Sequence, residues 1–336
     1  MNGLSLSIYI IGAILISNSL LIDKLTLFSN MVVFYSYAMQ VIMSFLMLVM
    51  VFMMLPRAEV SAKRINEVLD AEDKIIEGNI TKGSEEGTIE FKNVSFKYPD
   101  AEEYVLENIS FKVNKGETIA FIGSTGSGKS TLINLIPRFY DVTSGEILVD
   151  GVNVKDYQKE TLNNIIGYVS QRAVIFSGTV KSNIKFGKSK NKITEKDILD
   201  AAKIAEAKEF VEKMEDTYDS HISQGGTNIS GGQKQRLSIA RAVAKNPEIY
   251  IFDDSFSALD YKTDAVLRQN LKKNKKDATM LIVAQRIGTI MNADKIMVLD
   301  NGKCVGIGTH KELLKNCEVY KEIALSQLSK EELENA

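Results

Sequence analysis

Two long uncharged stretches dominate the first 55 residues of the chain. Leu4 to Ile22 is interrupted only by Ser, Asn and Gly, and Met31 to Leu55 is longer, with Gln40 as its most polar residue. Each stretch is long enough to cross the ~30 Å hydrocarbon core of a bilayer as a helix. The pattern predicts a transmembrane α-helical hairpin with spans at about 4–22 and 31–55.

The segment after the second span, 56–70, is amphipathic and rich in helix-forming residues. We expect it to continue the second span, so that residues 1–70 form one membrane unit. A signal peptide would need a basic region before the first stretch and a small-residue cleavage site after it, and neither is obvious. Two buried helices of a globular protein remain the alternative.

Residues 71–88 are polar and contain glycine, which predicts a linker. Beyond it, short β-type runs alternate with helical stretches. The predicted strands are 89–96, 118–122, 146–149, 165–170, 249–253, 280–284 and 295–299. This alternation predicts an α/β domain over 89–336, with its ligand at the carboxyl ends of the strands.

Charge separates the two regions further. The first 55 residues carry two charges, Asp23 and Lys24, whereas the remainder is rich in charge. Arg57, Lys63 and Arg64 follow the second span, so the positive-inside bias places the C-terminal bulk in the cytoplasm, below the cell membrane. The formal net charge of −2 argues against a nucleic-acid partner. Two cysteines and two histidines are too few and too widely spaced for a disulfide framework or a metal cluster.

The phosphate-binding pattern G-x-x-x-x-G-K-[ST] is matched by Gly123-Ser124-Thr125-Gly126-Ser127-Gly128-Lys129-Ser130. It lies between a predicted strand and a helix-prone stretch that includes Thr131, which is the context that a phosphate loop requires. The glycines allow consecutive backbone N–H groups to point at an anion. Lys129 would reach the β- and γ-phosphates and Ser130 would hold Mg²⁺. The pattern predicts a nucleoside triphosphate site.

A second glycine-rich segment precedes a helical stretch farther along the chain. This signature segment consists of Ser230, Gly231, Gly232 and Gln233. A glycine-rich helix start is a second potential phosphate site. Shortly after it, the strand 249–253 ends in the carboxylates Asp253 and Asp254.

Together these motifs resemble those of ATP-binding cassette (ABC) exporters, and residues 1–336 resemble the C-terminal part of an ABC half-transporter. The phosphate loop alone occurs in many ATPases, but its combination with the signature segment is specific. The resemblance implies an α/β P-loop ABC ATPase domain preceded by the last two of six membrane helices. It implies ATP and Mg²⁺ as ligands, and export of a small or lipophilic molecule across the lipid bilayer.

The resemblance also assigns individual roles. Tyr98 would stack on adenine, and Gln171 would contact Mg²⁺ and the membrane domain, although the residues alone indicate a half-buried tyrosine and a surface glutamine. Asp253 would bind Mg²⁺ through water, beside Ser130. In the family, two ATPase domains pair head to tail, so that the signature segment of one completes the ATP site of the other.

Two positions depart from the family pattern. Asp254 stands where the family carries a catalytic glutamate, and the loss of one methylene shortens its reach by ~1.5 Å. A displacement of ~1 Å at a reacting centre can cost about a hundredfold in rate. Gln285 stands where the family carries a switch histidine, and a neutral amide cannot exchange protons near neutral pH. Both changes predict an ATP site that binds ATP and hydrolyses it slowly.

We therefore expect a heterodimer in which a second ABC half-transporter supplies the faster site. A symmetric homodimer in which Asp254 still acts as the base remains an alternative, as does a regulatory subunit that never hydrolyses ATP. Two spans cannot enclose a transport pathway for which the family uses six per half. We expect a fragment, an internal start or a reduced subunit that does not transport by itself.

Overall fold

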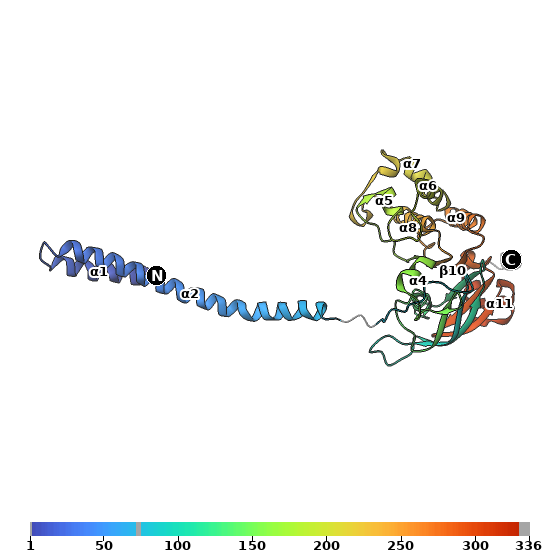
Figure 1. Cartoon of the computed structure of the whole chain (residues 1–336), viewed down its shortest axis with the longest axis horizontal. Helices are drawn as coiled ribbons and strands as arrows, with labels where there is room; N and C mark the ends of the chain where they lie inside the picture. The colour runs from blue at the N-terminus through green and yellow to red at the C-terminus, as the bar shows by residue number, and fades with distance from the viewer. Residues whose placement is uncertain (1, 72–74, 329–336) are drawn as a thin grey trace. The chain divides into compact units, whose positions relative to one another are not determined.

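The computed structural model describes residues 2–71 and 75–328, and these two ranges belong to two separate compact units. The first unit contains helix α1 (Asn2–Ser17) and the 46-residue helix α2 (Lys24–Leu69). The rings of Tyr9 and Tyr35 stack with centroids 5.4 Å apart, and a Cβ at Gly12 would lie 2.1 Å from the sulfur of Met31. The later residue of α1, Gly12, meets the earlier residue of α2, Met31, so the two helices form an antiparallel hairpin (Figure 1).

The two helices differ from the predicted spans. Helix α1 ends at Ser17, and at 1.5 Å per residue its 16 residues reach only about 24 Å, less than a hydrocarbon core. Leu20, Leu21 and Ile22 lie in the turn that follows, so apolar composition overestimated the first span. In the described part of the chain, α2 is the one helix that is long and apolar enough to cross a membrane. It continues through Pro56, whose missing N–H removes one helical hydrogen bond without ending the helix.

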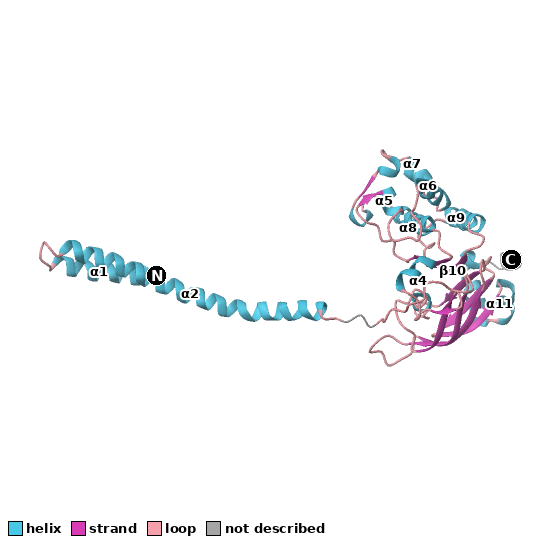
Figure 2. Cartoon of the chain, in the orientation of Figure 1, coloured by secondary structure: helices cyan, strands magenta, loops and turns pink. Residues whose placement is uncertain are grey.

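The second unit is built on two sheets and confirms the predicted α/β fold (Figure 2). A six-stranded sheet has the order β12-β11-β3-β10-β9-β6, in which only β12 is antiparallel to its neighbour. Its strands are β3 (Thr118–Gly123), β6 (Ile166–Val169), β9 (Ile249–Asp253), β10 (Thr279–Val283), β11 (Lys295–Asp300) and β12 (Lys303–Gly308). An antiparallel sheet has the order β2-β1-β4-β5, with β1 (Ile89–Phe96), β2 (Leu106–Val113), β4 (Ser144–Val149) and β5 (Val152–Asn153).

Helices surround the parallel sheet, and Figure 2 shows several of them gathered to one side of the strands. They are α3 (Lys129–Asn134), α4 (Lys159–Ile165), α5 (Val180–Ile184), α6 (Glu195–Ile204), α7 (Lys208–Glu212), α8 (Gly231–Lys245), α9 (Tyr261–Asn274), α10 (Ile287–Ile290), α11 (His310–Asn316) and α12 (Glu318–Gln327). A small ribbon of β7 (Gly178–Thr179) and β8 (His221–Ile222) and two short 3₁₀ turns, Thr217–Asp219 and Gln224–Gly226, complete the unit.

Alternate residues of the buried strands feed two separate cores. Ile249 and Ile251 face the core that lies toward the antiparallel sheet, whereas Tyr250 and Phe252 face the core shared with α8 and α9. Strands covered on both faces carry continuous apolar runs, which explains why β9 and β10 were predictable. Strands β2 and β12 were missed because neither is a continuous apolar run: β2 mixes polar with apolar residues, and β12 contains two glycines and is largely exposed.

The segment 75–88, expected to be part of a linker, bonds to the second unit along its length. Ile80 N–H donates to Asp156 O (2.9 Å), and the N–H groups of Ser84 and Glu85 donate to Asp150 O. Gly87 N–H donates to the Asp150 carboxylate at 2.7 Å. The α/β unit therefore begins before its first strand.

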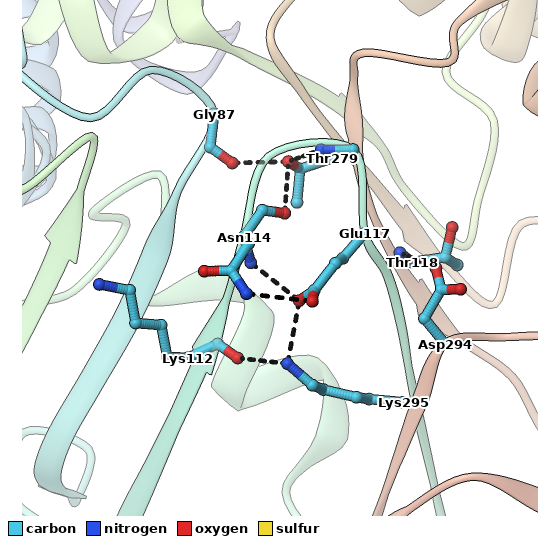
Figure 3. A network of polar contacts seen from close by, with 9 residues as sticks. Gly87, Lys112, Asn114, Glu117, Thr118, Thr279, Asp294 and Lys295 are labelled. Atoms are coloured by element: carbon cyan, nitrogen blue, oxygen red, sulfur yellow. Dashed lines mark hydrogen bonds and ion pairs between the residues drawn. The ribbon is translucent and has the colours of Figure 1, made fainter.

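Thr279 fixes the end of this segment to the base of the parallel sheet (Figure 3). Its buried hydroxyl donates to Gly87 O at 2.5 Å and accepts from Gly116 N–H at 3.2 Å. Beside it, the Glu117 carboxylate accepts from Asn114 and from Lys295. Burial raises the Glu117 pKa, but these hydrogen bonds outweigh that effect and hold it below its usual value.

We expect Thr279→Val to lower the free energy of unfolding by about 1–3 kcal/mol, because it leaves the buried Gly87 C=O and Gly116 N–H without this partner. Urea denaturation of the full chain in detergent, followed by circular dichroism, measures the change. Thr227→Val at an exposed position is the matched control and should stay within about 0.5 kcal/mol. Equal midpoints for the two variants would contradict the role given to the hydroxyl.

Asp150 makes a contribution to stability that depends on pH. Burial, followed by the nearby Glu248 carboxylate, raises the Asp150 pKa to about 7. The folded state therefore holds this proton more tightly than the unfolded state, whose Asp has a pKa of about 3.9, so the stability that Asp150 contributes falls as the pH rises from about 4 to about 7.

Asp150→Asn retains an acceptor for Gly87 N–H and cannot ionise. We expect the urea midpoint of the variant to rise relative to that of the wild type as the pH rises from 5 to about 7. Above that pH the difference between the two midpoints should stay constant. A pH-independent gap between the two proteins would refute the assignment.

Candidate nucleotide site

The predicted phosphate loop joins β3 to α3. Gly126 and Gly128 adopt φ values of 84° and 96°, which other residues rarely tolerate, and a Cβ at Gly128 would lie 2.8 Å from the Leu106 side chain. Lys129 Nζ donates to Gly123 O (2.9 Å) and Ser124 O (2.6 Å), inside the curve of the loop. Burial lowers the pKa of Lys129, and the nearby carboxylates oppose that effect. The loop therefore presents a partly buried cation within a ring of backbone groups.

Asp253, the last residue of β9, lies beside the start of α3. Its Oδ1 accepts from the Ser130 hydroxyl at 2.9 Å, and its Oδ2 accepts from Tyr168 at 3.3 Å. Burial raises the Asp253 pKa, while these hydrogen bonds and Lys129 lower it. A hydroxyl and a carboxylate are the hard oxygen ligands that Mg²⁺ prefers, and Mg²⁺ usually completes its shell with phosphate and water. Within the described residues no group of three or more His, Cys, Asp or Glu could hold a metal by itself.

Asp254 is held by two amide side chains. Gln285 Nε2 donates to Asp254 Oδ2 at 2.8 Å, and Gln171 Nε2 donates to the same oxygen at 3.3 Å. The backbone of Asp254 has a φ of 45° and its N–H donates to Val283 O (3.0 Å). Burial, followed by the charge of Asp253, raises the Asp254 pKa, and the amide donors oppose the rise. The carboxylate is therefore fixed by the same amide that occupies the switch position.

The phosphate loop, Asp254 and both glutamines border one cavity of about 280 Å³, and Asp253 adjoins it through its hydrogen bond with Ser130. It is lined by Val105, Thr125, Gly126, Gly128, Lys129, Ser130, Thr131, Gln171, Asp254, Val283 and Gln285. Tyr98 lies next to it, with its hydroxyl 3.0 Å from Thr131 Oγ1 and its ring edge-on to Phe96 and Tyr140. The structure thus brings the phosphate loop, both carboxylates and both glutamines together.

The signature segment lies elsewhere on the unit. Ser230 is the N-cap of α8: its hydroxyl accepts from Gln233 N–H, and its own N–H donates to Gln233 Oε1 at 2.8 Å. Ser230 and Gly231 are exposed, and a Cβ at Gly231 would meet no atom within 4 Å. Among the described residues that line the cavity, none belongs to this segment. The start of α8 is therefore accessible to another molecule.

Tyr168 is a site residue that the sequence analysis missed. Its hydroxyl donates to Asn134 Oδ1 at 2.8 Å as well as contacting Asp253, and burial raises its pKa. The available signal was a tyrosine within a buried strand, three residues before Gln171.

Comparison with known proteins agrees with this geometry. The family model described as ABC transporter matches residues 106–257. An uncharacterized ABC transporter ATP-binding protein of Mycobacterium bovis is 45% identical over 302 residues, 89% of this chain and 52% of that protein. A Staphylococcus aureus protein named as a multidrug export ATP-binding/permease protein is 48% identical over 238 residues, 71% of this chain and 41% of that protein.

A solved structure extends the similarity to the fold. A bacterial Atm1-family ABC exporter with ATP bound superposes with a TM-score of 0.75 at 31% identity, covering 91% of this chain and 54% of that one. The chain spans about half the length of the relatives and the structure that it matches. The protein therefore carries an ABC transporter ATP-binding domain, an α/β ATPase fold that a long apolar helix precedes in the sequence.

Proposed function

We propose that this chain is an ATP-binding/permease subunit of an ABC exporter whose own ATP site hydrolyses ATP slowly. The observation that carries the second part is the hydrogen bond from Gln285 to Asp254, because it joins the two residues that depart from the family pattern. The export role rests on the ABC domain, the long apolar helix α2 and the names of the similar proteins.

The cavity residues divide the work of binding ATP. Lys129 and the loop N–H groups would hold the phosphates. The Thr131 hydroxyl would hold Tyr98 in position to stack on adenine. Ser130 and Asp253, already in contact at 2.9 Å, would hold Mg²⁺ with help from Gln171. Bound Mg²⁺ would neutralise negative charge on the transferring phosphoryl group.

The geometry at Asp254 favours slow turnover. Two amides donate to one carboxylate oxygen, so that oxygen is less available to accept a proton from water. Gln285 directs one of its two amide N–H groups at Asp254, whereas a switch residue should contact the γ-phosphate. An amide also cannot accept and return a proton near neutral pH. The site would thus retain ATP longer than it hydrolyses it.

The exposed signature segment supports a partner ATPase domain. Ser230 to Gln233 lie outside their own chain's cavity, so they would complete the ATP site of a second half-transporter. We favour a heterodimer, since a slow site is useful beside a faster one. There are two alternatives: a homodimer with Asp254 as the base, and a regulatory subunit that binds ATP without turnover. Measurements of ATP binding and turnover distinguish them.

The apolar unit would lie in the cell membrane with the ATPase domain in the cytoplasm. No residue of helix α2 is buried within the described chain, which suits contact with lipid or with further membrane helices. The transported molecule would be small or lipophilic, and no nucleic acid is involved. The additional helices needed for a pathway would come from elsewhere in the assembly.

The double variant Asp254→Glu, Gln285→His tests the slow site. In the full chain in lipid nanodiscs, we expect the wild type to bind Mg-ATP with little turnover and the double variant to be at least about tenfold faster, because the longer carboxylate reaches the attacking water. Phosphate release and fluorescent-ATP binding are measured on both proteins. Fast turnover by the wild type would favour the homodimer, and an inactive double variant that still binds ATP would favour the regulatory subunit.

Two further variants should fail at different steps. Lys129→Ala should lose Mg-ATP binding, whereas Gly231→Asp should keep the wild-type dissociation constant within about twofold, since no atom lies near its added Cβ. In the double-variant background, Gly231→Asp should nevertheless lower turnover by about a hundredfold or more, because it places a carboxylate where the partner's phosphate would bind. Retained turnover would exclude a role for the signature segment in trans.

A further inference from the structure

Residues 284–286 connect the end of β10 to Ile287, the first residue of α10, and we call residues 285–287 the switch loop. The side chains at 285 and 286 are each held by neighbouring residues. Gln285 donates to Asp254, as described above, and Arg286 donates to Ser257 O at 3.4 Å while its guanidinium lies 4.9 Å from the centre of the Tyr261 ring. These contacts involve side chains at 285 and 286 and leave the loop backbone to be held by something else.

The loop backbone is held by Gln327, the last residue of α12. Gln327 Nε2 donates to Gln285 O at 2.7 Å, and Gln327 Oε1 accepts from Ile287 N–H at 2.8 Å. One side-chain amide therefore pairs with a carbonyl and an N–H two residues apart, as a neighbouring backbone strand would. The Ile287 N–H is the first of α10, which has no capping side chain at its N-cap Arg286. Gln327 supplies that missing acceptor.

Helix α12 is a firm support for this clamp. Tyr320 and Ala324, on its inner face, are fully buried, and the Tyr320 hydroxyl lies 2.6 Å from His310 Nδ1 at the start of α11. Helix α12 also packs against β3, β11 and α10. Because both hydrogen bonds from Gln327 to the loop go to backbone groups, they do not depend on whether residue 285 is glutamine or histidine.

We propose that Gln327 is a positioning residue of the ATP site, through which the C-terminal helix α12 sets the placement of the switch side chain. This inference rests on the proposed ATPase function, since placement matters only if residue 285 acts on ATP. The chemistry is a two-point amide clamp on the backbone at 285 and 287.

The test uses three versions of the full chain in nanodiscs, each in the wild-type and the Asp254→Glu, Gln285→His backgrounds. Gln327→Leu removes both hydrogen bonds, Gln327→Glu keeps only the acceptor for Ile287 N–H, and Gln269→Leu alters an exposed glutamine on α9 as the control. Hydrogen exchange of peptides covering 285–290 is measured by mass spectrometry. Steady-state turnover with increasing Mg-ATP gives kcat and KM.

We expect Gln327→Leu to speed exchange of the Ile287 amide by about tenfold or more, because its acceptor is lost, while peptides from β9 and α8 stay unchanged. Gln327→Glu should stay within about threefold of the parent, because its acceptor remains. In the double-variant background, Gln327→Leu should lower kcat by about tenfold with KM within about twofold, since a displaced switch residue affects reaction more than binding. Gln269→Leu should leave both readouts unchanged.

Unchanged exchange at 285–290 in Gln327→Leu would overturn the clamp whatever happens to turnover. Faster exchange with unchanged kcat would overturn the positioning role, and so would a loss of protection spread over the whole ATPase unit. If the double variant itself is inactive with Gln327 intact, the proposed slow site fails on separate grounds. In that case Gln327→Leu must still speed exchange at 285–290 and weaken the protection that Mg-ATP adds there, or the inference falls with it.

Discussion

The parallel register of four adjacent strands is the constraint on which the site depends. Strands β3, β10, β9 and β6 lie side by side in that order and end at the same edge of the sheet. Lys129, Gln285, Asp254 and Gln171 each follow one of these ends, so side chains far apart in the sequence meet in one cavity. No single loop builds this site. The site is formed by the four short loops that follow these strands, and the buried apolar strands of the sheet fix the spacing of the loops.

Burial at the ends of these strands changes the pKa values of the site carboxylates. Placed at a partly buried sheet edge, Asp253 and Asp254 both have a raised pKa, and each is stabilised as an anion by donors from neighbouring strand ends. Ser130 and Tyr168 serve Asp253, which leaves the amides of Gln171 and Gln285 for Asp254. The two departures from the family pattern are thus structurally matched: the shorter acid and the amide are within direct hydrogen-bonding distance.

Local signals in the sequence predicted much of this arrangement. Glycines at fixed spacing, continuous apolar strands and strand-end carboxylates are patterns that can be recognised within a few residues. They were therefore enough to predict the phosphate loop, β9 and the α/β class. The docking of 75–88 did not, because Thr279 and Asp150 secure it across long separations in sequence. Gln327 was equally hidden, since an exposed glutamine on a terminal helix has no local pattern that indicates its backbone partners. The predicted first span extends beyond α1, which ends at Ser17, because hydropathy measures composition and is insensitive to where a helix turns.

The backbone of Asp254 has a consequence for how such a site could change over time. At a φ of 45° it lies in the left-handed region, which aspartate and asparagine tolerate better than other residues with a Cβ. Glutamate lacks the short polar side chain that stabilises this backbone conformation, so the residue expected to be the faster base would also carry more backbone strain. With the slow site proposed above, backbone stability and rate of turnover would therefore favour different residues at position 254. If a partner subunit supplies the faster ATP site, as proposed, aspartate at this position would lower backbone strain without loss of function in the assembly.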